Sequence, residues 1–155
     1  MRRPIVIPAA LVALLLLAML GPVAFAQGMK WRGSGGWGPG SPYGRMYDAK
    51  TVDKVTGEVA KVDTITPMRG MSGGVHVALK SEQGEVSVHL GPQWYLENQD
   101  VKIEPGDRVE ITGSRVTVQG KPAIIAAEVR KGDEVLQLRD AAGVPVWAGW
   151  RKRGR

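Results

Sequence analysis

The sequence predicts one small all-β domain of the barrel class, which occupies residues 47–150. Valine and isoleucine alternate there with polar residues in short runs, as they do in half-buried strands. Turns rich in glycine and proline separate these runs at short spacing. The chain has no cysteine, so a hydrophobic core and not disulfide bonds must hold the domain together. A domain of about 105 residues is long enough for such a core.

The first expected strand is unusually long and covers residues 52–65. Its apolar positions include Val55 and Val59, and Gly57 breaks the run at a point where a strand can bulge or bend. A glycine-rich loop follows at residues 67–74. We therefore expect a strongly coiled strand that leads into this loop.

Two runs, 75–81 and 86–90, predict a hairpin around a turn at 82–85. A symmetric turn sets Leu79 opposite Val88, and the apolar faces of the two strands then coincide. A slip by one residue would pair apolar with polar side chains along the whole hairpin. We therefore predict this hairpin in this register.

Beyond the hairpin, Gly91 and Pro92 interrupt the alternation, and the remaining elements follow at short spacing. They are a short helix at 93–99, a turn at 104–107, strands at 108–114, 116–118 and 123–129, and a last hairpin with arms at 135–138 and 144–147. One strand, a hairpin, a short helix and a second hairpin is the order of a five-stranded Greek-key OB barrel. We therefore predict a small OB-like Greek-key barrel with one short helix and an extra C-terminal hairpin, which either closes the barrel or forms an interface. Another small β-barrel is the alternative.

The first 26 residues predict a secretory signal peptide. Arg2 and Arg3 precede an apolar run, and a small-x-small site ends at Ala26, so cleavage would start the mature protein at Gln27. Prolines and a glycine interrupt the run, and its apolar centre spans only 12 residues, which favours cleavage over a retained anchor. We expect a periplasmic or secreted protein without a stable membrane span.

Residues 27–46 predict a flexible tether ahead of the domain. From residue 28 to residue 44, seven of 17 residues are glycine, and such a composition buries too little apolar surface to offset backbone entropy. Aromatic residues, among them Trp37 and Tyr43, lie in it close to basic residues, and they could stack on bases or dock on the domain. The predicted units are therefore 1–26 (signal peptide), 27–46 (tether), 47–150 (OB-like barrel) and 151–155 (basic tail).

Two histidines, His76 and His89, lie on the polar face of the predicted hairpin. The expected register places them at diagonal positions about 7 Å apart, on one face with Lys80 and Ser87. The second and third strands form the usual ligand face of OB folds. His76, Lys80, Ser87 and His89 are therefore the predicted ligand face.

A transition metal is one candidate ligand for this face. Imidazole nitrogens bind copper, zinc and nickel, and thioethers bind reduced copper. Met68 and Met71, in the loop before His76, could complete a metal site with His76 and His89. The spacing shows neither a C-x-x-C nor an H-x-x-x-H motif, so copper or another transition metal stays an alternative and no cofactor is assigned.

The basic residues give only weak support for a polyanion. The formal net charge is +6, yet residues 48–140 hold 12 basic and 15 acidic residues, a net charge of −3. The excess of positive charge lies at the ends of the chain, where Arg151, Lys152, Arg153 and Arg155 form the candidate polyanion site. Nucleic acid is therefore a less favoured partner than a small ligand or a periplasmic protein.

No catalytic group can be assigned from the spacing of the residues. Each serine or carboxylate would need a base and an orienting partner, and the histidines lie on a sheet face rather than visibly in a cleft. We therefore expect no enzymatic activity.

The segments Gly73-Gly74-Val75-His76-Val77, Val88-His89-Leu90-Gly91-Pro92, Gly106-Asp107, and Leu138-Arg139-Asp140 with Gly143, Pro145 and Trp147 form a familiar pattern. With it, residues 47–150 resemble small exported bacterial OB-fold-like proteins that are similar to the soluble domain of some magnetosome-associated proteins and are sometimes labelled DNA-binding. The resemblance implies an OB-like fold, an extracytoplasmic setting, and an iron or copper context for His76 and His89. It does not extend to covalent haem attachment through C-x-x-C-H, because the chain has no cysteine.

The sequence thus predicts a periplasmic, non-enzymatic OB-like binding module. Its His-bearing face would meet a small ligand or a protein partner. The alternatives are a metal-binding accessory protein, related to copper or iron, and a nucleic-acid-binding or polyanion-binding protein that uses the basic tail.

Overall fold

The computed structural model describes residues 34–148, and the statements below concern this part of the chain. Its elements, in chain order, are η1 (Gly44–Met46), η2 (Ala49–Thr51), β1 (Val52–Ile65), β2 (Gly74–Ser81), β3 (Gly84–Pro92), α2 (Gln93–Leu96), β4 (Arg108–Val118), β5 (Lys121–Lys131) and β6 (Glu134–Gln137). The predicted signal peptide and basic tail lie outside the described residues.

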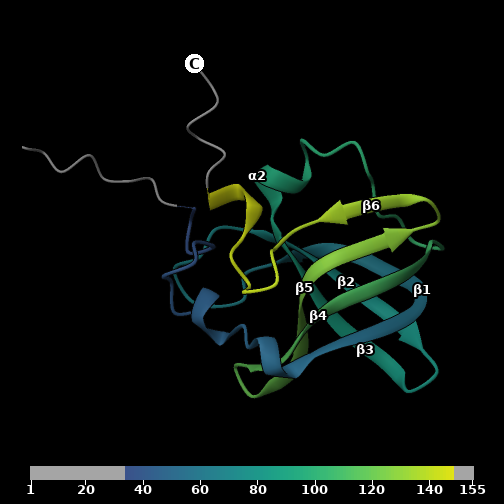
Figure 1. Cartoon of the computed structure of the whole chain (residues 1–155), viewed down its shortest axis with the longest axis horizontal. Helices are drawn as coiled ribbons and strands as arrows, with labels where there is room; N and C mark the ends of the chain where they lie inside the picture. Colours follow the sequence, from purple (N-terminus) through teal and green to yellow (C-terminus); the bar gives the residue numbers. More distant parts are fainter. Residues whose placement is uncertain (1–33, 149–155) are drawn as a thin grey trace, which may run out of the picture. The chain divides into compact units, whose positions relative to one another are not determined.

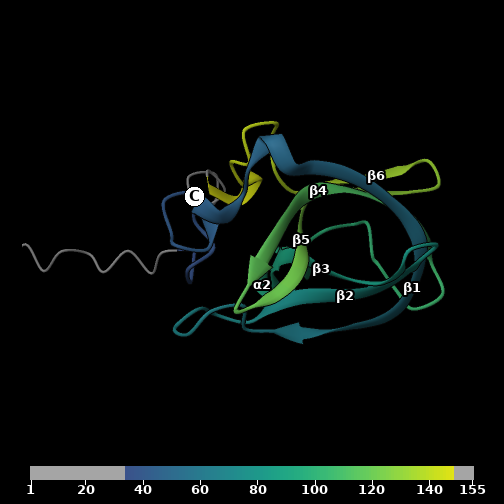
Figure 2. The same cartoon turned by 90° about the horizontal axis from the view of Figure 1, so that it is seen from below.

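The strands form one sheet that closes into a ring (Figure 1; Figure 2). Their order is β3-β2-β1-β4-β5-β6, and neighbouring strands are antiparallel. A short parallel pairing of β3 with β5 closes the ring. In this parallel seam Val88 pairs with Ile124, and His89 pairs with Ile125. The predicted all-β barrel-like fold with one short helix is confirmed, and strand, hairpin, helix and hairpin follow in the predicted order.

β1 is long enough to pair with a different strand along each of its two halves. Its first half pairs with β4 and its second half with β2, and Gly57 has a partner in each. A Cβ atom at Gly57 would lie 2.2 Å from the carbonyl oxygen of Lys80, so the two backbones approach too closely for a side chain. The expected bulge lies just beyond this glycine, as a register shift between Val59 and Lys61.

The hairpin of β2 and β3 has the predicted faces but a different register. Leu79 pairs with Val86 and not with Val88, because a loop of only two residues, 82–83, joins the strands. Gly84 adopts a φ of +107°, which is strained for residues with a side chain, and this conformation allows the tight turn. The shift from the predicted register is two residues, an even number, so apolar side chains still meet apolar side chains.

The core fills the ring. All five barrel strands contribute buried side chains to one hydrophobic cluster, which includes Val55, Val59, Val77, Leu79, Val88, Leu90, Val109, Ile111, Ile124 and Val129. Burial of each such side chain stabilises the fold by about 1.5–3 kcal/mol before entropy is counted. Between residues 34 and 148, no helix is long and apolar enough to cross a membrane.

The C-terminal segment folds back on the barrel. The first predicted arm, 135–138, lies mostly in β6, which pairs with β5. The second predicted arm, 144–147, meets the chain after β6 through one isolated bridge, between Arg139 and Pro145. Trp147 at its end is buried, and its ring lies 5.3 Å from that of Tyr95 in α2, measured between centroids. The hairpin therefore covers α2, and the closure of the barrel is left to β3 and β5.

Residues 34–46 correct the predicted tether. Trp37 and Tyr43 are each only 1% exposed and belong to the core cluster. The Trp37 Nε1–H donates to the carbonyl oxygen of Ser72 over 3.0 Å, and its ring lies against the backbone of Gly74. The prediction of a flexible tether is wrong for this stretch, because two aromatic anchors bury enough apolar surface to offset the entropy of the glycine-rich backbone.

Candidate functional site

The predicted ligand face lies on one side of the β2–β3 hairpin. His76 pairs directly with His89, and the two ring centroids are 6.0 Å apart. Ser87 contacts His76, whereas Lys80 lies further along β2, opposite Glu85, with an exposed side chain. The structure therefore brings together three of the four predicted residues.

Asp63 joins this cluster from β1. Its Oδ1 lies 2.7 Å from Nδ1 of His76, and Nε2 of the same ring lies 2.7 Å from Oγ of Ser87. Its other oxygen, Oδ2, contacts the Lys61 ammonium at 2.7 Å. Asp63 is not among the residues that the sequence predicts for this face. The signal that identifies it is the pairing of β1 with β2, which sets Asp63 opposite His76.

The charge of Asp63 fixes the direction of these hydrogen bonds. The hydrogen bond from Lys61 is the main cause that lowers the pKa of Asp63, and the hydrogen bond from His76 lowers it further. An ionised carboxylate only accepts hydrogen bonds, so Nδ1 of His76 carries a hydrogen and donates it. In the neutral ring Nε2 is then the acceptor, and the Ser87 hydroxyl donates to it.

His89 differs from His76 because it is buried. Its ring stacks on Tyr43, with centroids 6.0 Å apart, and its Nδ1 lies 3.1 Å from the Tyr43 hydroxyl. Burial lowers the pKa of His89 to about 4, with smaller contributions from the charges of His76 and Arg139. His89 is therefore a neutral imidazole at physiological pH.

The burial of His89 predicts a protein that mild acid destabilises. The pKa of His89 is about 4 in the folded chain and 6.5 without the fold, so between these values the unfolded state binds the additional proton. The free energy of unfolding is therefore highest above pH 6.5 and falls as the pH is lowered through this window, by about 3 kcal/mol at pH 4. Urea denaturation at a series of pH values measures this slope.

The variant His89→Gln should lack most of the slope between pH 6.5 and pH 4. The carboxylates with a lowered pKa, Asp53, Asp63 and Asp107, contribute stability that is lost only below their unfolded pKa of 3.8, so they act in a separate window. A slope that is the same in the variant and the parent protein would contradict the assignment to His89.

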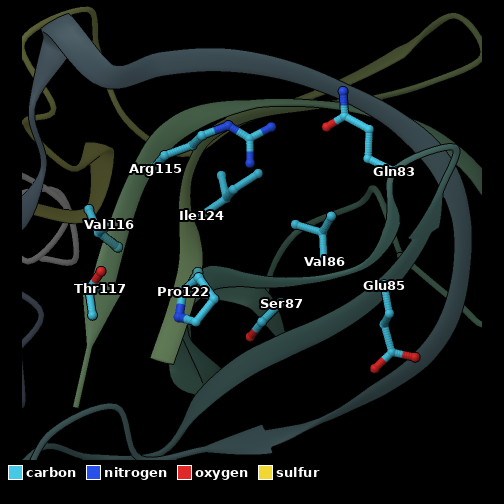
Figure 3. A pocket seen from close by; sticks show the side chains of 10 residues that line it. Gln83, Glu85, Val86, Ser87, Arg115, Val116, Thr117, Pro122 and Ile124 are labelled. Atoms are coloured by element: carbon cyan, nitrogen blue, oxygen red, sulfur yellow. The ribbon is translucent and has the colours of Figure 1, made fainter. Parts of the chain in front are cut away.

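Ser87 borders two cavities. The smaller has a volume of about 240 Å³ and lies between the end of β1, β3 and the β4–β5 turn, where its lining includes His89 and Lys121. The larger, of about 510 Å³, lies between β3 and β5 beyond their parallel seam (Figure 3). Val86 and Ser87 form one wall of the larger cavity, and residues of β4 and β5 form the other: Arg115, Val116, Thr117, Pro122 and Ile124.

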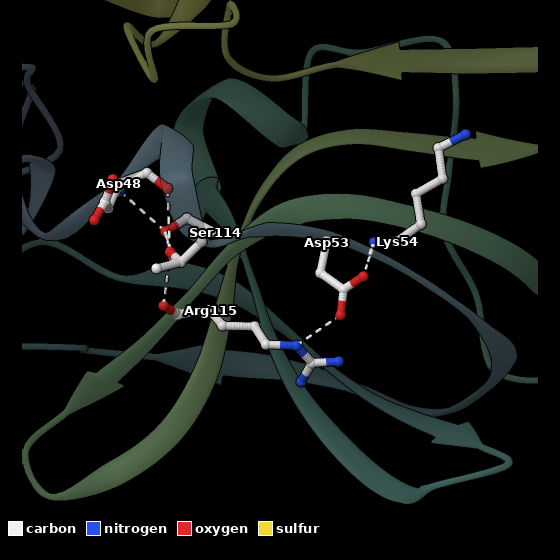
Figure 4. Close-up of polar contacts among 6 residues, drawn as sticks. Asp48, Asp53, Lys54, Ser114 and Arg115 are labelled. Carbon is white, nitrogen blue, oxygen red and sulfur yellow. Dashed lines mark hydrogen bonds and ion pairs between the residues drawn. The ribbon is translucent and has the colours of Figure 1, made fainter.

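A polar network holds the start of β1 against β4 beside the larger cavity (Figure 4). The Ser114 hydroxyl accepts from the backbone N–H of Asp48 over 3.0 Å. Arg115 Nε donates to Oδ2 of Asp53 over 2.9 Å, and this hydrogen bond is the main cause that lowers the pKa of Asp53. The ion pair thereby orients the guanidinium group that lines the larger cavity.

The predicted metal set of His76, His89, Met68 and Met71 is only partly assembled. Both ring nitrogens of His76 and Nδ1 of His89 hydrogen-bond to protein groups. The two methionines are half-buried and pack against the core cluster. No group of three or more His, Cys, Asp or Glu side chains within the described residues is placed to hold a metal ion. The metal site therefore stays a prediction.

Comparison with known families identifies the barrel. Residues 51–136 match the model of the MamS/MamX magnetosome protein family, which is more than half of the chain. The chain belongs to the MamS/MamX magnetosome protein family. The predicted similarity to magnetosome-associated proteins is thereby confirmed. A search of curated proteins found no match.

The part that matches the MamS/MamX family contains the polar cluster. Asp63, His76, Ser87 and His89 all lie within residues 51–136, as do the residues that line both cavities. The aromatic anchors Trp37, Tyr43 and Trp147 lie outside it. The candidate polyanion residues Arg151, Lys152, Arg153 and Arg155 lie outside the described residues, and that assignment stays a prediction.

Proposed function

We propose that this member of the MamS/MamX family is a periplasmic binding module that takes a small organic acid in the smaller cavity on its His-bearing face. The periplasmic setting is supported by the predicted signal peptide at residues 1–26. The binding role is supported by one observation above all, a cavity of about 240 Å³ at the place where the sequence predicts the ligand face.

The lining of this cavity favours the proposed class of ligand. Its lining combines apolar and polar residues in about equal parts: Ile65, Val118 and Ala123 are among the apolar ones, and His89 and Ser87 are among the polar ones. Small-molecule sites combine apolar walls with polar groups that orient the ligand. Lys121 places a positive charge at the cavity wall, and none of the described lining residues is acidic. The negatively charged carboxylate of a short organic acid is therefore the complementary ligand.

Nuclear magnetic resonance titration with acetate, butyrate and succinate tests this proposal. We expect saturable shifts of backbone amide signals confined to the cavity lining, among them those of Ser87 and His89. The variant Ala123→Leu fills the cavity and should abolish the shifts, because Ala123 is buried in its wall. The matched control Ala141→Leu lies in an exposed turn and should retain them.

Two results would contradict the binding role. One is the lack of saturable shifts with all three acids, and the other is a response that Ala123→Leu leaves unchanged. Titration with copper, nickel and zinc separates the metal-binding alternative, which the 6.0 Å spacing of the His76 and His89 rings favours. Saturable metal binding that the double variant His76→Ala with His89→Ala lacks would support that alternative.

A further inference from the structure

Asp63, His76 and Ser87 form a continuous hydrogen-bonded chain across three adjacent strands. The carboxylate meets Nδ1 of the imidazole, and Nε2 of the same ring meets the serine hydroxyl, each over 2.7 Å. Asp63 lies directly opposite His76, and Ser87 is its diagonal neighbour on β3, so the three side chains project from one face of the sheet. This is the order of groups in which an imidazole takes a serine proton and a carboxylate stabilises the resulting imidazolium.

The proton positions also fit this chemistry. The ionised Asp63 requires the hydrogen on Nδ1, and Nε2 of the neutral ring is therefore free to accept from Ser87. The Lys61 ammonium holds the second oxygen of Asp63, which keeps the carboxylate in place beside the ring. Ser87 is half-buried and borders both cavities, so it lies next to space in which an ester could bind.

We propose that Ser87 is a nucleophile that cleaves small carboxylic esters, with His76 as its general base. Asp63 is a positioning residue that sets the tautomer and orientation of the ring. This activity goes beyond the binding role, which needs the cavity alone. It also departs from the expectation of no enzymatic activity, because the structure places a serine and a carboxylate next to His76.

The reaction is an acyl transfer to serine followed by hydrolysis. Ser87 Oγ forms a bond to the ester carbonyl carbon, its proton passes to Nε2 of His76, and the carbonyl π electrons move to oxygen. Collapse of this intermediate breaks the ester C–O bond, and the leaving oxygen takes the proton from His76 and departs as an alcohol. Water then attacks the acyl-serine in the same way and releases the carboxylic acid. Ester and water are converted to acid and alcohol.

The two cavities indicate the class of ester. The smaller cavity has a volume of about 240 Å³ and apolar residues on part of its wall, which suits a short acyl chain. His89, Gln119 and Lys121 carry the side-chain N–H groups of its lining, and such donors stabilise a carbonyl oxygen that gains negative charge. The larger cavity is lined by Arg115 and Glu85 and suits a polar alcohol group.

Labelling and hydrolysis by the purified full chain test the proposal. A fluorophosphonate probe should add once, at Ser87, as located by mass spectrometry of the digested protein. Hydrolysis of 4-nitrophenyl acetate should fall by about 100-fold or more in Ser87→Ala and in His76→Ala. The matched control Ser81→Ala removes a hydroxyl that donates to the carbonyl oxygen of Gly84 in the same hairpin, and it should retain both signals.

The variant Asp63→Asn tests the positioning role. In Asp63→Asn the amide can donate to Nδ1, which places the ring hydrogen on Nε2. Nε2 can then no longer accept from Ser87, so we expect labelling at least about 100-fold slower than in the parent protein. A merely structural role for Asp63 would lower the midpoint of thermal unfolding and leave the labelling rate of the folded protein unchanged.

The lack of an adduct at Ser87 in the parent protein overturns the proposal, and so does hydrolysis that Ser87→Ala retains. Labelling of the parent protein requires no variant to fold, and thermal unfolding of each variant separates a lost fold from lost chemistry. Binding of organic acids in the smaller cavity does not need the Ser87 hydroxyl as a nucleophile. The failure of the esterase proposal is therefore distinguishable from the failure of the binding role.

Discussion

Replacement of Trp37 by alanine is expected to lower the free energy of unfolding by about 3–5 kcal/mol. The Trp37 ring is 1% exposed and meets the Tyr43 ring edge-on, with centroids 5.0 Å apart. Its indole N–H bonds to Ser72, and its carbonyl oxygen accepts from Nε1 of Trp147 over 2.9 Å. The variant would therefore leave a large cavity between the two ends of the described chain. Urea denaturation followed by circular dichroism measures the change.

The exposed Arg45 supplies the control for this prediction. It lies in the same glycine-rich segment, and Arg45→Ala should change the free energy of unfolding by less than about 0.5 kcal/mol. If the two variants were equally stable, residues 34–46 would not be part of the folded domain, and the correction to the predicted tether would itself fail.

Replacement of Arg139 by alanine is expected to cost about 3–5 kcal/mol of stability. Its guanidinium group is buried, donates to the carbonyl oxygens of Leu90 and Ala126, and lies 4.9 Å from the centroid of the Trp147 ring. Burial lowers the pKa of Arg139 to about 10, so the side chain is still charged at neutral pH. Without it, two buried carbonyl groups lose their donor and the ring loses its cation.

Two further variants separate the contributions of Arg139. Arg139→Met keeps the apolar stem that packs against the core but removes both donors, so it should recover only part of the loss. Arg130→Ala removes an exposed ion pair with Glu128 on the same part of the sheet and should cost at most about 1 kcal/mol. Chemical denaturation compares all three. A full recovery of stability in Arg139→Met would show that packing and not hydrogen bonding accounts for the effect.

The features that the sequence predicted correctly are those that depend on local pattern. Alternation with a period of two sets which side chains of β2 and β3 face the core, and no distant residue is needed to read it. The register required more than pattern, because the length of the turn depends on whether Gly84 adopts a positive φ. His76 and His89 were therefore placed on the right face but not directly opposite each other.

The features that were missed depend on contacts between distant parts of the chain. Asp63 reaches His76 through the pairing of β1 with β2, and that register includes a shift between Val59 and Lys61 that an alternating pattern does not reveal. The overall composition of residues 34–46 does not reveal the role of Trp37 and Tyr43. These two side chains pack against β2, β3 and the loop before β2, which are distant in the sequence. Average composition describes the backbone entropy of a segment and not its few anchors.

We expect the barrel to open most readily along its parallel seam. Only two residue pairs join the described strands β3 and β5. Just beyond them, the carbonyl oxygens of Leu90 and Ala126 accept hydrogen bonds from Arg139, and the β3–β5 pairing does not extend further. Local opening of a folded protein begins where few backbone hydrogen bonds must break. Amide hydrogens along this line should therefore exchange with solvent before those of the long antiparallel pairs. Both cavities that Ser87 borders are also lined by residues of β5, so opening of this seam would also widen the two cavities in which we propose that ligands bind.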